Sequence, residues 1–274
     1  MPYTPEEVKE MRRLMGITDE PEQMRIDTSL PAGIADITAV YICLENISCV
    51  DADGNITENH PKLYVKKDIE RKADGTFIRF TPYKGITHFE QQGNGLFVPS
   101  MALSCRILDI AWQNKGNPEF AKILEQYKDY GPGYGWHCQN TLVDYAGQMI
   151  IYYPFDADFT SHGGTSGINT GKKIILPFSK NGLKSAALED ALNNANTARF
   201  VRQFTGLQNP AVLIEIGKYF GKPARLWFPG NDATNCNQTR AAWLGCDNNN
   251  FSLNANEYRN NNVVAARGVR RGER

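Results

Sequence analysis

The chain has 274 residues, of which 41% are hydrophobic, 22% charged and 11% aromatic, and thirty basic residues balance thirty acidic ones. This composition is typical of a soluble globular protein that can bury a sizeable core without disulfides. A net charge of zero argues against binding to nucleic acid through a general electrostatic field. No apolar run approaches the roughly 20 residues that a membrane-spanning helix needs.

The first 30 residues predict an N-terminal helix and a lead-in segment. Thr4 suits the N-cap, Pro5 the first helical position, and Glu7 completes a capping box. A secretory signal has a different order of charge, apolar run and cleavage site, so we expect a cytoplasmic protein, with surface display by another route left open. The cysteines show no metal-ligand spacing and are expected to be free thiols. They are Cys43, Cys49, Cys105, Cys138, Cys236 and Cys246.

Residues 34–80 alternate β-rich runs with turn signals. TAVYICLENISCV, KLYVKK and FIRFTPY are separated by DADGN and ADGT, which predicts antiparallel strands and hairpins. Asp51, Asp53 and Asn55 have the alternate spacing of an EF-hand loop. However, the glycine comes two places early and the closing glutamate is missing, so a hairpin turn is the better interpretation.

Helical and extended patterns alternate in the next part of the chain. Apolar spacing predicts two helices between residues 99 and 127, with Pro118 near the start of the second. A hairpin follows in NTLVDYAGQMIIYYP, then a polar, glycine-rich loop over 156–173. Further helices are expected over 185–204 and 210–219, and a strand over 224–228. This order of elements predicts an α+β protein.

Three possible enzymatic signals are weak. His137 and Cys138 are neighbours on an extended segment, so their side chains should point to opposite faces. The glycine-rich HGGTSG at His162 has no G-x-S-x-G nucleophile motif to accompany it. Asp156 and Asp158 lie in a loop with no regular frame to fix the separation that a glycosidase needs.

The segment from Asn231 to Asn262 holds eleven of the 24 asparagines in the chain. Asparagine forms strands and helices poorly, so this composition alone would indicate a turn-rich or disordered tail. Bulky residues such as Trp243, Phe251 and Leu253 interrupt the asparagines, and disordered tails lack such anchors. A folded segment that displays asparagines is therefore the better prediction. The asparagines are Asn231, Asn235, Asn237, Asn248, Asn249, Asn250, Asn254, Asn256, Asn260, Asn261 and Asn262.

The order of WLG at 243–245, clustered asparagines and ARGVR at 266–270 resembles the variable proteins of diversity-generating retroelements. Proteins of that family end in a C-type lectin-like fold, related in shape to the formylglycine-generating enzyme. A reverse transcriptase copies a template in which adenines are misread, and the copy replaces the coding region. AAC and AAT codons are preferred targets, which would explain an excess of asparagine at surface positions.

The resemblance implies an α+β C-type lectin-like domain over residues 31–274, with antiparallel strands, helices and long irregular loops. An inserted β-rich region at about 31–90 is left open. Residues 231–262 would be the variable region, and its eleven asparagines the ligand-binding surface. Trp227, Trp243, Gly245 and the run Arg267–Arg270 would be fixed scaffold. The implied function is non-enzymatic binding of a partner, expected to be a protein, with no cofactor or metal.

Two other hypotheses remain. The first is an enzyme of the formylglycine-generating type, for which Cys236 and Cys246 are the available cysteine pair. The second is a structural domain that carries a flexible asparagine-rich tail. Calcium binding is also left open, because lectin-like folds bind calcium only in some branches.

Overall fold

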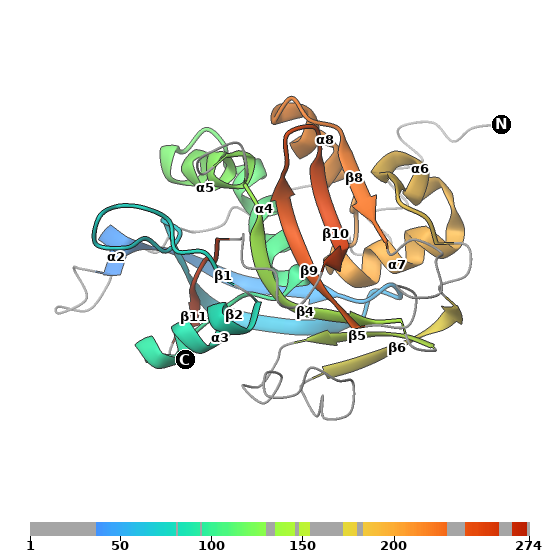
Figure 1. The fold of residues 1–274 in the computed structure, drawn as a ribbon, viewed down its shortest axis with the longest axis horizontal. Coiled ribbons are helices and arrows are strands. Elements are labelled where there is room, and N and C mark those ends of the chain that lie inside the picture. The colour runs from blue at the N-terminus through green and yellow to red at the C-terminus, as the bar shows by residue number, and fades with distance from the viewer. Residues whose placement is uncertain are drawn as a thin grey trace, which may run out of the picture.

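The computed structural model describes residues 37–80, 82–93, 95–129, 135–145, 148–153, 172–179, 183–228, 239–257 and 265–272. These residues form helices and two β-sheets, so the chain is an α+β protein (Figure 1). The predicted N-terminal helix, His162, Asp156 and Asp158 lie outside the described residues. Within those residues, no helix has the length and apolar character needed to cross a membrane.

The smaller sheet brings the beginning and the end of the described chain together. Its four strands have the order β1-β2-β11-β3. The C-terminal strand β11 pairs antiparallel with both β2 and β3, so Val269 lies between Val65 and Phe97. The strands are β1 (Tyr41–Val50), β2 (Ile56–Lys66), β3 (Leu96–Phe97) and β11 (Val269–Arg271).

The larger sheet has seven strands in the order β6-β5-β4-β9-β10-β8-β7. Its neighbours pair antiparallel except β8 and β10, which are parallel. The prediction of antiparallel strands is therefore wrong for this one pair. The strands are β4 (His137–Asp144), β5 (Gln148–Tyr153), β6 (Lys172–Ser179), β7 (Ala186–Ala187), β8 (Ala224–Trp227), β9 (Thr239–Cys246) and β10 (Phe251–Glu257).

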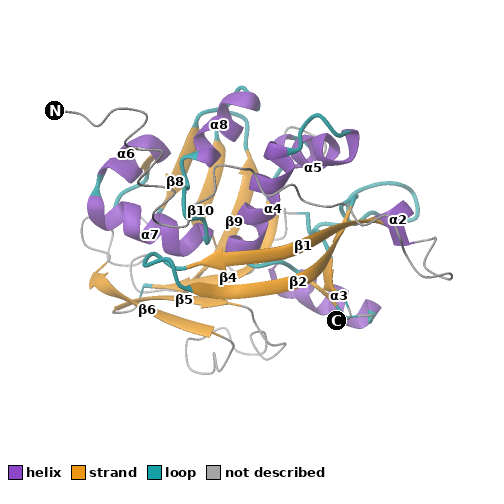
Figure 2. Ribbon diagram, turned by 180° about the vertical axis from the view of Figure 1, so that it is seen from behind, coloured by secondary structure: helices purple, strands orange, loops and turns teal. Residues whose placement is uncertain are grey.

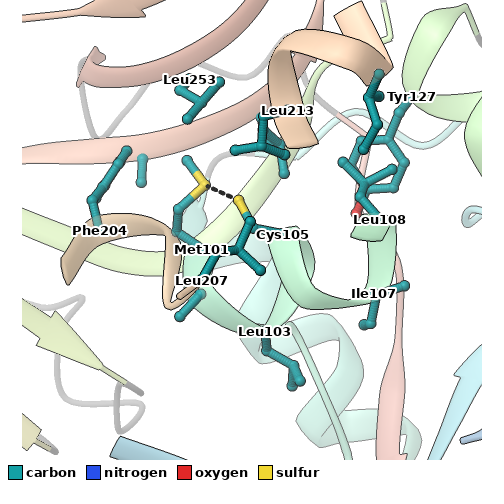
Figure 3. Packing of buried hydrophobic residues seen from close by; sticks show 14 of the residues in the cluster. Met101, Leu103, Cys105, Ile107, Leu108, Tyr127, Phe204, Leu207, Leu213 and Leu253 are labelled. Carbon is teal, nitrogen blue, oxygen red and sulfur yellow. Dashed lines mark hydrogen bonds between the residues drawn. The ribbon is translucent and has the colours of Figure 1, made fainter. Parts of the chain in front are cut away.

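The helices lie mainly on one side of the larger sheet, as Figure 2 shows from behind. The central helix, α4, contacts α5, α7 and α8 as well as β4 and β9. In Figure 3, Met101 and Cys105 of α4 pack close to Leu213 of α8 and Leu253 of β10. The helices are α2 (Ile37–Val40), α3 (Pro82–Gln92), α4 (Met101–Gln113), α5 (Pro118–Lys128), α6 (Leu188–Asn193), α7 (Ala195–Thr205) and α8 (Val212–Tyr219).

Several local predictions are confirmed. The two helices expected between 99 and 127 are α4 and α5, and Asn117 caps α5 directly before Pro118. The DADGN segment is the β1–β2 turn, in which Asp51 Oδ1 accepts hydrogen bonds from the backbone N–H groups of Asp53 and Asn55. The strand at 224–228 is β8.

Two local predictions are wrong. The single helix expected over 185–204 is divided into α6 and α7, because the Asn194 side chain accepts a hydrogen bond from Thr197 N and begins a new helix there. The strand expected in FIRFTPY is reduced to single bridge residues, of which Phe77 pairs with Arg71. Helix α3 then begins at Pro82, a residue that suits the first turn of a helix.

Candidate binding surface

Strand β9 packs against a hydrophobic cluster on each of its two faces. Leu244 and Cys246 belong to the main core beside α4, whereas Trp243 belongs to a second cluster that includes Phe89 of α3. Trp243 is 1% exposed and meets the Trp136 ring edge to face, with 5.1 Å between centroids. The predicted burial of Trp243 is confirmed.

Gly245 and the C-terminal run are also built into the scaffold. Gly245 has φ +140°, and a Cβ there would lie 1.9 Å from the Gly135 carbonyl oxygen, so only glycine fits without displacing the backbone. Arg267 is 1% exposed and donates hydrogen bonds to the Lys66 carbonyl oxygen and to Gln126 Oε1. These contacts join the C-terminal segment to β2 and α5.

Strand β10 alternates between the core and an open face. Leu253 and Ala255 are fully buried in the main core, whereas Asn254 and Asn256 are half-buried. The parallel register places Arg225 beside Ser252 and Trp227 beside Asn254. Register partners lie on the same face of a sheet. We therefore define the β8–β10 face as Arg225, Trp227, Ser252, Asn254 and Asn256.

Helices α4, α7 and α8 lie behind the β8–β10 face in Figure 1. Ala224 and Leu226, which alternate with Arg225 and Trp227 along β8, are buried in the main core on the helical side. Arg225 and Trp227 are instead half-buried. The face is therefore accessible over β8 and β10, although α3 and its cluster cover the same side of the sheet at β9.

A chain of hydrogen bonds fixes the centre of this face. Trp227 Nε1 donates to Ser252 Oγ at 3.1 Å, and Ser252 Oγ donates to Asp247 Oδ2 at 3.0 Å. The other oxygen of Asp247 accepts from Asn249 N at 2.8 Å and from Asn250 N at 2.7 Å. Asp247 thereby holds the β9–β10 turn and orients the indole of Trp227 through Ser252.

Five of the predicted ligand-binding asparagines lie within the described residues. Asn248 and Asn249 are exposed in the β9–β10 turn, and Asn250 beside them is half-buried. Asn254 and Asn256 lie on the β8–β10 face, where Asn254 Oδ1 accepts a hydrogen bond from Asn256 N at 2.7 Å. The other six predicted positions lie outside the described residues. These are Asn231, Asn235, Asn237, Asn260, Asn261 and Asn262.

Arg225, Asp247 and Ser252 were not predicted as parts of this surface, and Trp227 was assigned to the scaffold alone. The two-residue period of a strand already places Arg225 and Trp227 of ARLWF on one face. What the sequence did not reveal was the pairing of that strand with β10, which brings these residues beside the asparagines.

The thiols and histidine that were considered for catalysis are buried. Cys138 and His137 point to opposite sides of β4, as predicted: Cys138 joins the second cluster, and His137 stacks on Tyr127 with 4.0 Å between ring centroids. Burial raises the pKa of Cys138 to about 12, and burial with the nearby Arg267 lowers the pKa of His137 to about 3. Burial also raises the pKa of Cys246 to about 12. None of these groups is suited to act as an ionised nucleophile or base near neutral pH.

A groove of about 490 Å³ lies elsewhere, between the edge of β1, the second half of α4 and the segment after α7. Its charged groups, Arg106 and Asp109, pair with each other at 2.5 Å, and Asp109 also accepts from Gln113. None of the five predicted asparagines that the structure describes lines this groove. Within the described part of the chain, no group of three His, Cys, Asp or Glu residues is arranged to hold a metal ion.

In comparisons with known proteins, no family model, curated protein or solved structure matches this chain.

Proposed function

We propose that this chain is a non-enzymatic binding protein that recognises a protein partner through the β8–β10 face and the β9–β10 turn. We further propose that it belongs with the variable proteins of diversity-generating retroelements and has their C-type lectin-like scaffold. The observation that carries the proposal is the division of residues within one hairpin. Trp243, Phe251 and Leu253 are at most 1% exposed, whereas the described asparagines between and beside them lie at the surface or half-buried.

This division separates recognition from folding. An asparagine side chain offers two hydrogen-bond donors and one acceptor on a short stem, which suits polar contacts to many partners. Its replacement at an exposed position removes little packing, while the buried anchors keep the strands in place. Repeated substitution at these positions could therefore change what is bound without unfolding the domain.

Contacts of the C-terminal segment and of Gly245 also support this proposal. Strand β11 returns to pair with β2, and Arg267 bonds to the backbone of β2 and to α5. Gly245 allows the end of β9 to pack closely against the backbone at Gly135. These contacts give the hairpin a rigid base, which a binding surface with changing side chains requires.

The alternative of a formylglycine-generating type of enzyme is less well supported. It needs an accessible cysteine that can ionise. Cys246 belongs to the main core and lies away from the β8–β10 face, and its pKa is raised to about 12 by burial. Its proposed companion Cys236 lies outside the described residues.

The test is the DNA that flanks the coding region. We expect a near-copy of the 3′ end of the gene beside a reverse transcriptase reading frame, with the two copies differing only where the template has adenine. A flanking region with no such repeat would contradict membership of this family. A repeat whose differences fall at codons for Trp243, Gly245 or Arg267 would contradict the division into fixed and variable positions.

A further inference from the structure

Arg225 is a cation without an anionic partner in the described part of the chain. Its guanidinium carbon lies 4.7 Å from the centre of the Trp227 ring. Its Nε is buried and makes no hydrogen bond, and no described carboxylate forms an ion pair with it. By contrast, Arg199 on α7 pairs with Asp53 at 2.8 Å. Arg225 is nevertheless only half-buried, so a group from outside can reach it.

Hydrogen bonds hold the Trp227 ring, on which Arg225 stacks, in a fixed orientation. Trp227 is bonded through Nε1 to Ser252, which is bonded in turn to Asp247. Asp247 already accepts hydrogen bonds from Ser252 and from two backbone N–H groups of the turn. Stacking on an aromatic ring restricts a guanidinium but leaves the N–H donors in its plane free. Those donors match the two oxygens of a carboxylate.

On the basis of the proposed function, we infer that Arg225 is a fixed anchor that binds a carboxylate of the protein partner, supplied by an Asp or Glu side chain. Arginine and tryptophan are the residue types that most often dominate the energy of protein interfaces. Both anchor residues precede the variable region of 231–262, while Asn254 and Asn256 lie beside them on the same face. Every diversified variant would therefore still bind an acidic residue of its partner through Arg225. Only the contacts around that residue would change.

The test selects peptides from a random library displayed on phage, with the full chain as the immobilised target. We expect the selected peptides to be enriched in Asp and Glu. The best peptide, made synthetically, should lose about tenfold in affinity when its acidic residue is changed to the corresponding amide. Arg225→Gln should lose about tenfold on the acidic peptide and should bind the acidic and amide peptides equally. Arg225→Lys should be intermediate, because it keeps the charge but not the planar fork.

The matched control is Arg202→Gln, which removes the same charge from an exposed position on α7, on the helical side of the sheet. This variant should bind like the parent, and circular dichroism should confirm that all variants are folded. Peptides without acidic enrichment, or an unchanged preference for acid in Arg225→Gln, would overturn the anchor and leave the binding function intact. Recovery of no peptide at all would also overturn the anchor, and the flanking DNA would then decide the proposed function separately.

Discussion

Trp243 and Asn254 are register partners on neighbouring strands and lie on the same face of the larger sheet, yet their environments differ. Trp243 is 1% exposed because α3 and Trp136 pack over β9, whereas Asn254 is half-buried because that cover ends before β10. The boundary between fixed and proposed variable residues therefore follows the edge of one hydrophobic cluster.

Substitutions of fixed residues should lower the free energy of unfolding much more than substitutions of the proposed variable residues. Trp243→Ala should lower the free energy of unfolding by about 3–5 kcal/mol, because the buried indole loses its transfer energy and leaves a cavity. Replacing Asn248, Asn250 and Asn256 together by alanine should cost no more than about 0.5 kcal/mol at each position. Denaturant unfolding of both variants beside the parent measures the difference. If the triple variant lost as much stability as the tryptophan variant, the asparagines would be structural.

The β9–β10 turn depends on one carboxylate rather than on its asparagines. Asp247 accepts hydrogen bonds from two backbone N–H groups and from Ser252. Asp247→Ala should therefore lower the free energy of unfolding by about 1–3 kcal/mol, the range expected when hydrogen bonds to a charged group are lost. Asn248→Ala, one position further and exposed, is the matched control and should change stability by less than about 0.5 kcal/mol. Equal effects of the two changes on denaturant unfolding would disprove the role of Asp247.

The helices and strands that depend on interactions between residues close together in the sequence were the ones that could be predicted. Helices α4 and α5 and the β1–β2 hairpin depend on local spacing, caps and turn residues, and they were predicted. The break at Asn194 was missed because a residue common in loops acts there as a cap between two consecutive helices.

The candidate binding surface could be predicted only in part for the same reason. The asparagines and the anchors beside them are local signals, and the burial of Trp243 followed from them. The parallel pairing of β8 with β10 is not local, because β9 lies between these strands in the sequence. Arg225 could therefore be recognised as part of the surface only once the sheet order was known.

At the scale of the whole molecule, a buried polar network joins α5, β4 and the C-terminal segment. His137 stacks on Tyr127, and its Nε2 lies 3.0 Å from the Gln126 carbonyl oxygen. Arg267 bonds to the Gln126 side chain and lies over the Tyr127 ring. Burial and the charge of Arg267 keep His137 neutral, with its pKa lowered to about 3.

This network makes stability depend on pH. Because the pKa of His137 is lower in the folded state than in the unfolded chain, the unfolded state binds more protons below about pH 6.5, and stability falls as the pH falls towards 3. Between pH 7 and pH 5 this residue should account for a loss of about 2 kcal/mol. His137→Gln should be less stable than the parent at pH 7. Its free energy of unfolding should, however, fall by correspondingly less than that of the parent between pH 7 and pH 5. An identical loss in the parent and the variant would show that His137 is not the titrating group.

The central claim is that a fixed scaffold presents a diversified surface, and sequencing many copies of this gene within one population tests it most directly. We predict that amino-acid differences concentrate between residues 231 and 262, at the asparagines and their surface neighbours. Trp243, Gly245 and Arg267 should be unchanged, because each is enclosed by the contacts described above. Differences scattered evenly along the chain, or frequent at these three residues, would contradict the claim.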